Sequence, residues 1–202
     1  MKRTLVSLAA AGLVLVSGCR VQVNKNEDGR DKNVKIDTPF GGLHVRSGDT
    51  NAADVGLPVY PGATLAPDEN GDKSADIHMG FGEWQLTVKV VKYQTPDSQD
   101  KVLDFYQKAM GRYGTVIRCQ GDAAVGTPTV TQEGLNCAED EHGKTHVDIS
   151  HVDISNDLSL RAGSRHHQHI VGIEKKSGPD THFALVELQL PAAIDKDSAK
   201  SE

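Results

Sequence analysis

Histidine is the residue type whose grouping most favours chemistry in this 202-residue chain. Three of the nine histidines, His166, His167 and His169, lie within four consecutive positions. Because side chains alternate along a strand, His167 and His169 would lie on one face and could together bind zinc or copper. This cluster is the candidate metal site. It supports one hypothesis of function, a metal-binding protein or a metal-dependent hydrolase.

Other histidines could join such a site only through folding. His142 and His146 have the spacing of a zinc pair on a helix, and His151 follows them. In that motif a glutamate follows the first histidine, whereas this chain has Gly143, and the segment favours strand or turn. Histidines in such settings are more often solvated or structural than metal-bound. The expected cofactor is therefore none, with zinc or copper as the alternative.

Calcium binding and nucleophilic catalysis have weaker support. Oxygen-bearing side chains alternate between residues 68 and 76, but an EF-hand loop needs Gly at its sixth position and Glu at its twelfth, where this stretch has Lys73 and Met79. The chain also lacks a Gly-x-Ser-x-Gly elbow and a complete Gly-x4-Gly-Lys-Ser/Thr phosphate-binding loop. The sequence therefore favours a protein that is not an enzyme.

The start of the chain indicates a lipid anchor. Two basic residues precede an apolar run at residues 5–17, which is too short to span a bilayer but suits a signal peptide. Residues 15–19, Leu-Val-Ser-Gly-Cys, resemble the lipobox of bacterial lipoproteins. The resemblance implies that residues 1–18 are a signal peptide and that Cys19 becomes lipidated. The alternative is an ordinary cleaved signal beside an incidental cysteine.

The anchor also suggests a location and partners. Arg20 follows the cysteine where the family's inner-membrane retention signal has Asp, so the resemblance implies the outer membrane, facing the periplasm. The formal net charge of −6 disfavours nucleic acid, which needs clustered Lys and Arg. The expected partners are the membrane and an envelope protein or cell-wall component. The leading hypothesis is therefore a lipid-anchored, non-catalytic binding or structural module of the cell envelope.

The two remaining cysteines, Cys119 and Cys137, are expected to form a structural disulfide. Export would take them into an oxidising compartment, where an isolated pair tends to be bridged. By the loop-entropy model the bond would contribute about 3 kcal/mol of stability. The alternative, a thiol nucleophile or redox pair, lacks a Cys-x-x-Cys spacing.

Composition divides the exported chain into three parts. Residues 19–54 mix both charges with few large apolar groups, which predicts a flexible tether after the lipidated cysteine. Within it, residues 34–45 alternate apolar and polar positions around a turn, which predicts a small hairpin. The globular domain is expected over residues 55–191, followed by a disordered tail at 192–202.

Strand patterns recur through the globular part. Residues 75–90 alternate around a glycine-rich turn, which predicts an antiparallel hairpin. The apolar set then changes face at Val91 and Tyr93, which indicates a bulge or the end of the strand. Residues 167–190 form the strongest hairpin pattern, with Ala184, Val186, Leu188 and Leu190 on the expected buried side. A tandem repeat, His-Val-Asp-Ile-Ser, occupies residues 146–155.

One helix is expected between the two hairpins. Its apolar stripe at helical spacing consists of Val102, Phe105, Tyr106, Ala109, Met110 and Tyr113. Asp97 is the expected N-cap. One amphipathic helix packed on a mostly antiparallel sheet makes the predicted fold α+β. The region bearing Tyr-Pro-Gly-Ala at residues 60–63 and Val-Leu-Asp-Phe-Tyr at 102–106 resembles uncharacterised secreted bacterial proteins, which implies no function.

Overall fold

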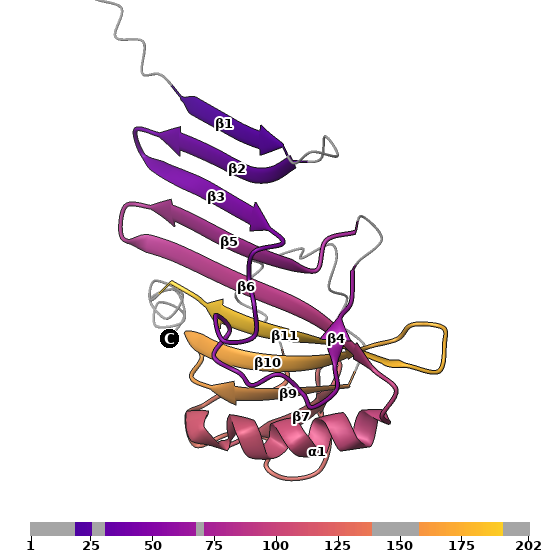
Figure 1. Cartoon of the computed structure of the whole chain (residues 1–202). Coiled ribbons are helices and arrows are strands. Elements are labelled where there is room, and N and C mark those ends of the chain that lie inside the picture. The colour runs from indigo at the N-terminus through magenta and orange to yellow at the C-terminus, as the bar shows by residue number, and fades with distance from the viewer. Residues whose placement is uncertain (1–18, 26–30, 68–70, 139–157, 192–202) are drawn as a thin grey trace, which may run out of the picture.

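The computed structural model of the chain describes residues 19–25, 31–67, 71–138 and 158–191. These residues form one eleven-stranded sheet and one α-helix, α1 (Gln99–Met110), which continues into a short 3-10 turn, η1 (Gly111–Tyr113) (Figure 1). The strands are β1 (Arg20–Lys25), β2 (Asp31–Thr38), β3 (Gly41–Ser47), β4 (Thr64–Leu65), β5 (Ser74–Phe81), β6 (Trp84–Thr95), β7 (Ile117–Gln120), β8 (Ala123–Ala124), β9 (Leu158–Gly163), β10 (His167–Glu174) and β11 (Thr181–Gln189). The expected combination of one helix with a mostly antiparallel sheet is confirmed, although strands dominate.

The sheet is open and antiparallel throughout, in the order β1-β2-β3-β5-β6-β11-β10-β9-β7-β8, and β4 pairs with β6. The C-terminal strand β11 lies at the centre, between β6 and β10. The predicted hairpin of β10 and β11 is confirmed, with His167 opposite Gln189 and Glu174 opposite His182. The last described strand therefore lies in the middle of the sheet.

Much of the segment predicted to be a tether forms strands of the sheet instead, in β1, β2 and β3. The hairpin within it is confirmed, since Val34 lies opposite Val45 and Ile36 opposite Leu43 in β2 and β3. However, β3 also pairs with β5, and β1 adds a further strand to β2. The composition argument failed because it counted charges and ignored their alternation with β-branched residues, which lets each strand pair along an existing edge.

The predicted hairpin at residues 75–90 is also confirmed, but β6 does not end or bulge where the apolar set changes face. Its pairing with β11 runs without a register shift from Thr87 to Thr95. The reason is that both faces of the strand are buried: Val88 and Val90 face one core, and Val91 and Tyr93 face the other. Since both faces of this part of β6 are covered, neither face has to carry polar side chains.

Helix α1 packs its predicted apolar stripe on the sheet, with Val102, Tyr106 and Met110 buried. The N-cap is Ser98 rather than Asp97. The carboxylate of Asp97 is used elsewhere: it accepts hydrogen bonds from the Tyr60 hydroxyl at 2.9 Å and from Lys101 at 2.7 Å. Asp97 therefore links the start of the helix to Tyr60, in the loop before β4, instead of capping the helix.

Two apolar cores lie on opposite faces of the sheet. The helix-side core contains Val55, Leu57, Val91, Tyr93, Val102, Leu103, Tyr106, Met110, Leu160, Val171, Phe183 and Leu185, among others. The other core contains Leu86, Val88, Val90, Ile170, Ala184 and Val186. Strand β11 therefore buries Phe183 and Leu185 as well as the predicted side with Ala184 and Val186.

The predicted disulfide is confirmed. Cys119 in β7 is bonded to Cys137, with their Cα atoms 5.5 Å apart, and both are buried together with Ile117. The predicted signal peptide, the tandem repeat at 146–155 and the tail at 192–202 lie outside the described residues, as do His142, His146 and His151.

Candidate functional site

His167 and His169 lie on the same face of β10, as predicted, with ring centroids 5.0 Å apart. His166 lies in the turn before the strand, where its backbone carbonyl accepts a hydrogen bond from the Leu190 N–H at 2.8 Å. The two strand histidines meet partners that the sequence analysis did not identify, Glu187 on β11 and Lys89 on β6. We call His167, His169, Glu187 and Lys89 the polar cluster.

The register of three neighbouring strands places the residues of the polar cluster next to one another. His169 lies directly opposite Glu187, and Glu187 lies directly opposite Lys89 on the next strand. The same row continues to Asp76 on β5 and Arg46 on β3. Side chains in one row are close enough to interact, and opposite charges on neighbouring strands stabilise a sheet. The cluster is thus the buried end of a row of alternating charge.

Glu187 is the centre of the cluster. One carboxylate oxygen accepts hydrogen bonds from His167 Nε2 at 2.9 Å and Gln189 Nε2 at 3.0 Å, and the other accepts one from Lys89 Nζ at 2.8 Å. Burial alone would raise the pKa of Glu187, but the bonds from Lys89, His167 and Gln189 outweigh it and hold the pKa below its ordinary value. Glu187 is therefore ionised at neutral pH and fixes the position of its neighbours.

His169 is buried, only 3% exposed, beneath the loop that precedes β4. Its Nδ1 lies 3.0 Å from the carbonyl oxygen of Val55, and because a carbonyl only accepts, Nδ1 carries the hydrogen. Nε2 has no hydrogen-bond partner among the described residues. Tyr113 stacks on the imidazole with centroids 3.6 Å apart. Burial, and secondarily the neighbouring His167, lowers the pKa of His169.

Residues 52–60, which we call the strap, are held over the sheet by side chains from several elements. Three of their backbone carbonyls accept hydrogen bonds from His169, Lys89 and Tyr106, and a fourth, that of Gly56, accepts from both Arg112 and Tyr113. Gly56 has a φ of +75°, and a Cβ there would lie 2.6 Å from the Tyr113 hydroxyl. Only glycine fits this close approach. His169 and Lys89 thus connect the polar cluster to the strap.

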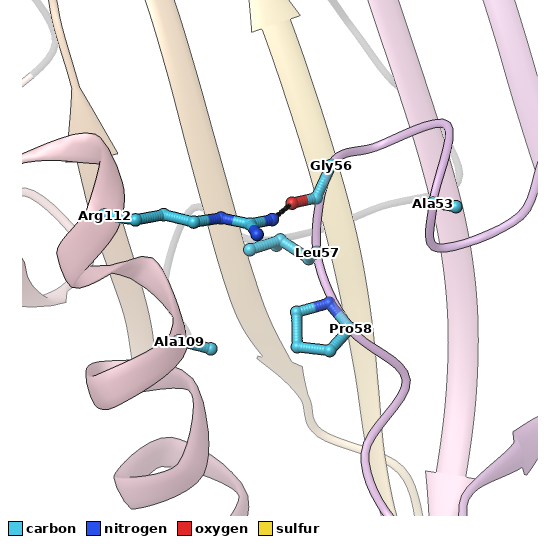
Figure 2. A pocket seen from close by; sticks show the side chains of 6 residues that line it. All are labelled: Ala53, Gly56, Leu57, Pro58, Ala109 and Arg112. Atoms are coloured by element: carbon cyan, nitrogen blue, oxygen red, sulfur yellow. Dashed lines mark hydrogen bonds between the residues drawn. The ribbon is translucent and has the colours of Figure 1, made fainter.

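A hollow of about 410 Å³ lies between the strap and the end of α1 (Figure 2). Its lining residues are Ala53, Gly56, Leu57, Pro58, Ala109 and Arg112. Figure 2 shows Arg112 reaching from the helix side to the carbonyl of Gly56. The one charged group of the lining therefore already has a backbone partner, and the rest of the lining offers no acid, base or nucleophile side chain.

The polar cluster does not bring together a predicted metal site. Across residues 19–25, 31–67, 71–138 and 158–191, no three His, Cys, Asp or Glu side chains are grouped so that they could hold an ion. Nδ1 of His169 is hydrogen-bonded to the carbonyl of Val55, and Nε2 of His167 is hydrogen-bonded to the carboxylate of Glu187. In the described part of the chain, no hydroxyl or thiol is hydrogen-bonded to either imidazole, so the His167–Glu187 pair has no nucleophile to activate there.

Sequence reasoning missed Glu187, Lys89 and Tyr113. Glu187 did carry a signal, because it is an acid within the apolar run at residues 183–188. A charge inside a buried strand requires a partner. The partner itself could not be identified from the sequence, because Lys89 is 98 positions away and only the insertion of β11 beside β6 brings it near.

The buried His169 predicts a stability change with pH. Because the pKa of His169 is lowered in the folded chain, the unfolded chain binds a proton more readily below the ordinary value of 6.5. The stability attached to neutral His169 is therefore complete above pH 6.5 and is lost as the pH falls below it. We expect His169→Gln, which cannot titrate, to show a smaller loss of unfolding free energy between pH 7 and pH 5 than the unchanged chain.

That comparison stays above pH 5 because Glu187, whose pKa is lowered, loses its contribution only below its ordinary value of 4.5. The groups around His169 are His167, Glu187, Arg112 and Tyr113, so its titration should also be read directly, from the imidazole NMR shifts. A His169 that titrates at or above 6.5 would contradict the prediction.

No family model, curated protein or solved structure matches the chain. Within the described residues, no helix is long and apolar enough to cross a bilayer.

Proposed function

We propose that this chain is a lipid-anchored protein of the bacterial cell envelope, attached through Cys19, whose sheet domain is a non-catalytic binding or structural module. The observation that carries the proposal is the lipobox-like segment at residues 15–19, which follows a basic start and a short apolar run. Arg20, at the position that follows the lipidated residue, favours the outer membrane as its location.

The state of the cysteines supports the proposal. Cys119 and Cys137 are bonded to each other, which suits an oxidising compartment outside the cytoplasm. Cys19 is exposed and free, directly before β1, so its sulfur is accessible to lipidation. Several acyl chains on one residue bind a membrane far more tightly than the marginal attachment that a single chain gives.

The non-catalytic part of the proposal is supported by how the polar cluster is used. His169 and Lys89 bond to backbone carbonyls of the strap, and His167 bonds to Glu187. Groups committed to holding a loop are poorly placed to act as general acid or base.

The test is fatty-acid labelling of the full chain, expressed in a bacterial host with its own signal. We expect the label on the unchanged protein, which should sediment with membranes, and none on Cys19→Ser, which should be released. Cys119→Ser should remain labelled, because the proposal assigns lipid to Cys19 alone. Labelling of Cys19→Ser, or an unlabelled wild-type chain that is exported and soluble, would contradict the anchor.

The metal-binding alternative is tested on the same preparation, purified without a histidine tag. Zinc or copper near one ion per chain, lost in His167→Asn, would replace the non-catalytic proposal with a metal-dependent one. Absence of bound metal would leave the polar cluster as the support of the strap.

A further inference from the structure

The lipidation site lies at one particular end of the sheet. Arg20, the first residue of β1, is directly opposite Asp37, next to the turn between β2 and β3. The register places Gly41, which ends that turn, opposite Phe81, beside the turn between β5 and β6. Figure 1 shows the start of β1 and both turns along the same edge of the molecule. We call this end, with its two turns, the sheet tip.

The sheet tip carries exposed aromatic side chains. Phe40, in the turn between β2 and β3, is 82% exposed, and Phe81 is 53% exposed. Trp84 is half-buried against the core that contains Leu86, and its ring lies 6.1 Å from that of Phe81 across the other turn. On β1 itself, Val21 is also exposed. Large apolar groups gathered at one end of a soluble domain are unusual and mark a surface that meets another apolar phase.

The short distance between Cys19 and the sheet tip indicates that this apolar phase is the bilayer. No residue separates Cys19 from β1, so the Cα atom of the first strand residue lies about 3.8 Å from that of the residue that would hold the lipid. Strands in a sheet are about 4.8 Å apart, which puts Phe40 and Phe81 within about 15 Å of that point along the edge. A domain attached through so short a connection cannot stand away from the membrane surface.

We propose that the sheet tip docks on the bilayer that holds the Cys19 lipids, with Phe40, Phe81 and Trp84 in the interfacial region. Aromatic side chains favour this region, where their rings are partly buried and their polar edges stay hydrated. Exposed Glu83 lies in the turn between Phe81 and Trp84, and its charge limits the depth to the headgroup level. The strands would then run away from the membrane surface, with the sheet tip in contact with it. This inference rests on the proposed lipid anchor.

Trp84 is the single tryptophan of the chain and serves as the probe. The sample is the full-length protein, purified with its lipid and reconstituted into phosphatidylcholine vesicles whose acyl chains carry bromine either near the headgroup or near the chain end. We expect the headgroup-proximal bromines to quench Trp84 fluorescence more strongly than the distal ones. The double variant Phe40→Ser and Phe81→Ser should lose about half of that quenching, because both anchoring rings are gone.

The matched control is Leu65→Ser. Leu65 is another exposed apolar residue, but it lies opposite Tyr93, toward the other end of β6. It should leave the quenching unchanged. Circular dichroism checks that all variants fold, which their exposure favours.

The outcomes separate this inference from the proposed function. A chain without lipid on Cys19 refutes the anchor before any vesicle is made. A lipidated, vesicle-bound chain whose Trp84 is not quenched by brominated lipid refutes the docking of the tip and leaves the anchor intact. Protection of Trp84 from aqueous iodide that rises with protein concentration, without lipid quenching, would place a second protein copy over the tip and would equally overturn the proposal.

Discussion

Phe183→Ala is expected to lower the unfolding free energy by about 3–5 kcal/mol, the range for removing a fully buried aromatic ring. Phe183 lies on central strand β11 with no exposed surface. Its ring contacts those of Tyr60, Tyr93 and Tyr106, with centroids 6.3, 5.8 and 5.8 Å away. The loss therefore removes contacts to the strap, to β6 and to α1 together, and the surrounding rings can collapse into the cavity only in part.

Urea denaturation followed by circular dichroism measures the effect. Phe183→Leu keeps most of the volume and should cost clearly less than alanine. Phe40→Ala removes the same side chain from the exposed sheet tip and should change stability by less than about 0.5 kcal/mol. If Phe183→Ala cost no more than Phe40→Ala, the helix-side core described above would be wrong.

Local patterns predicted those parts of the fold whose partners are close in sequence. The hairpins β2–β3, β5–β6 and β10–β11 could be recognised because alternation and turn residues lie in one short window. The stripe from Val102 to Tyr113 likewise identified the helix without reference to anything else. The pair Cys119 and Cys137 was predicted by elimination, once Cys19 had been assigned to the lipid.

Predictions failed where one strand joins another that is distant in the chain. The predicted tether rests on mixed charges and few large apolar groups, and nothing local shows that β3 pairs with β5. The change of face at Val91 and Tyr93 predicts a bulge or a strand end, but these residues face a second core that includes distant residues such as Phe183. Burial of both faces of a strand is a property of the completed sheet. Such a strand lacks the two-residue alternation of apolar and polar side chains by which strands are recognised in a sequence.

The candidate site shows the same limit. The spacing of His167 and His169 correctly predicted one shared face, but it could not show that Glu187 and Lys89 would complete the row. Nor could it show that the strap covers His169, since that contact joins residues 114 positions apart. The spacing of two histidines therefore predicted metal binding, whereas the structure shows both imidazoles hydrogen-bonded to acceptors within the chain.

Loss of the disulfide between Cys119 and Cys137 is expected to cost about 3 kcal/mol, because the bond closes a loop of about 18 residues in the unfolded chain. The bond joins β7, near the edge of the sheet, to the loop that contains Cys137 and the buried Leu135. Strand β8, which among the described strands pairs with β7 alone, lies in the same interval. Without the bond, this end of the sheet would be held by short pairings alone.

The effect can be measured on one protein by comparing urea midpoints with and without a thiol reductant. The variant Cys119→Ala with Cys137→Ala should unfold near the midpoint of the reduced chain and should not respond to reductant. Both sulfurs are buried, so attack by a thiol requires opening of the structure, and reduction of the folded chain should be slow. Rapid reduction of the folded protein with no change in midpoint would favour the redox alternative over a structural bond.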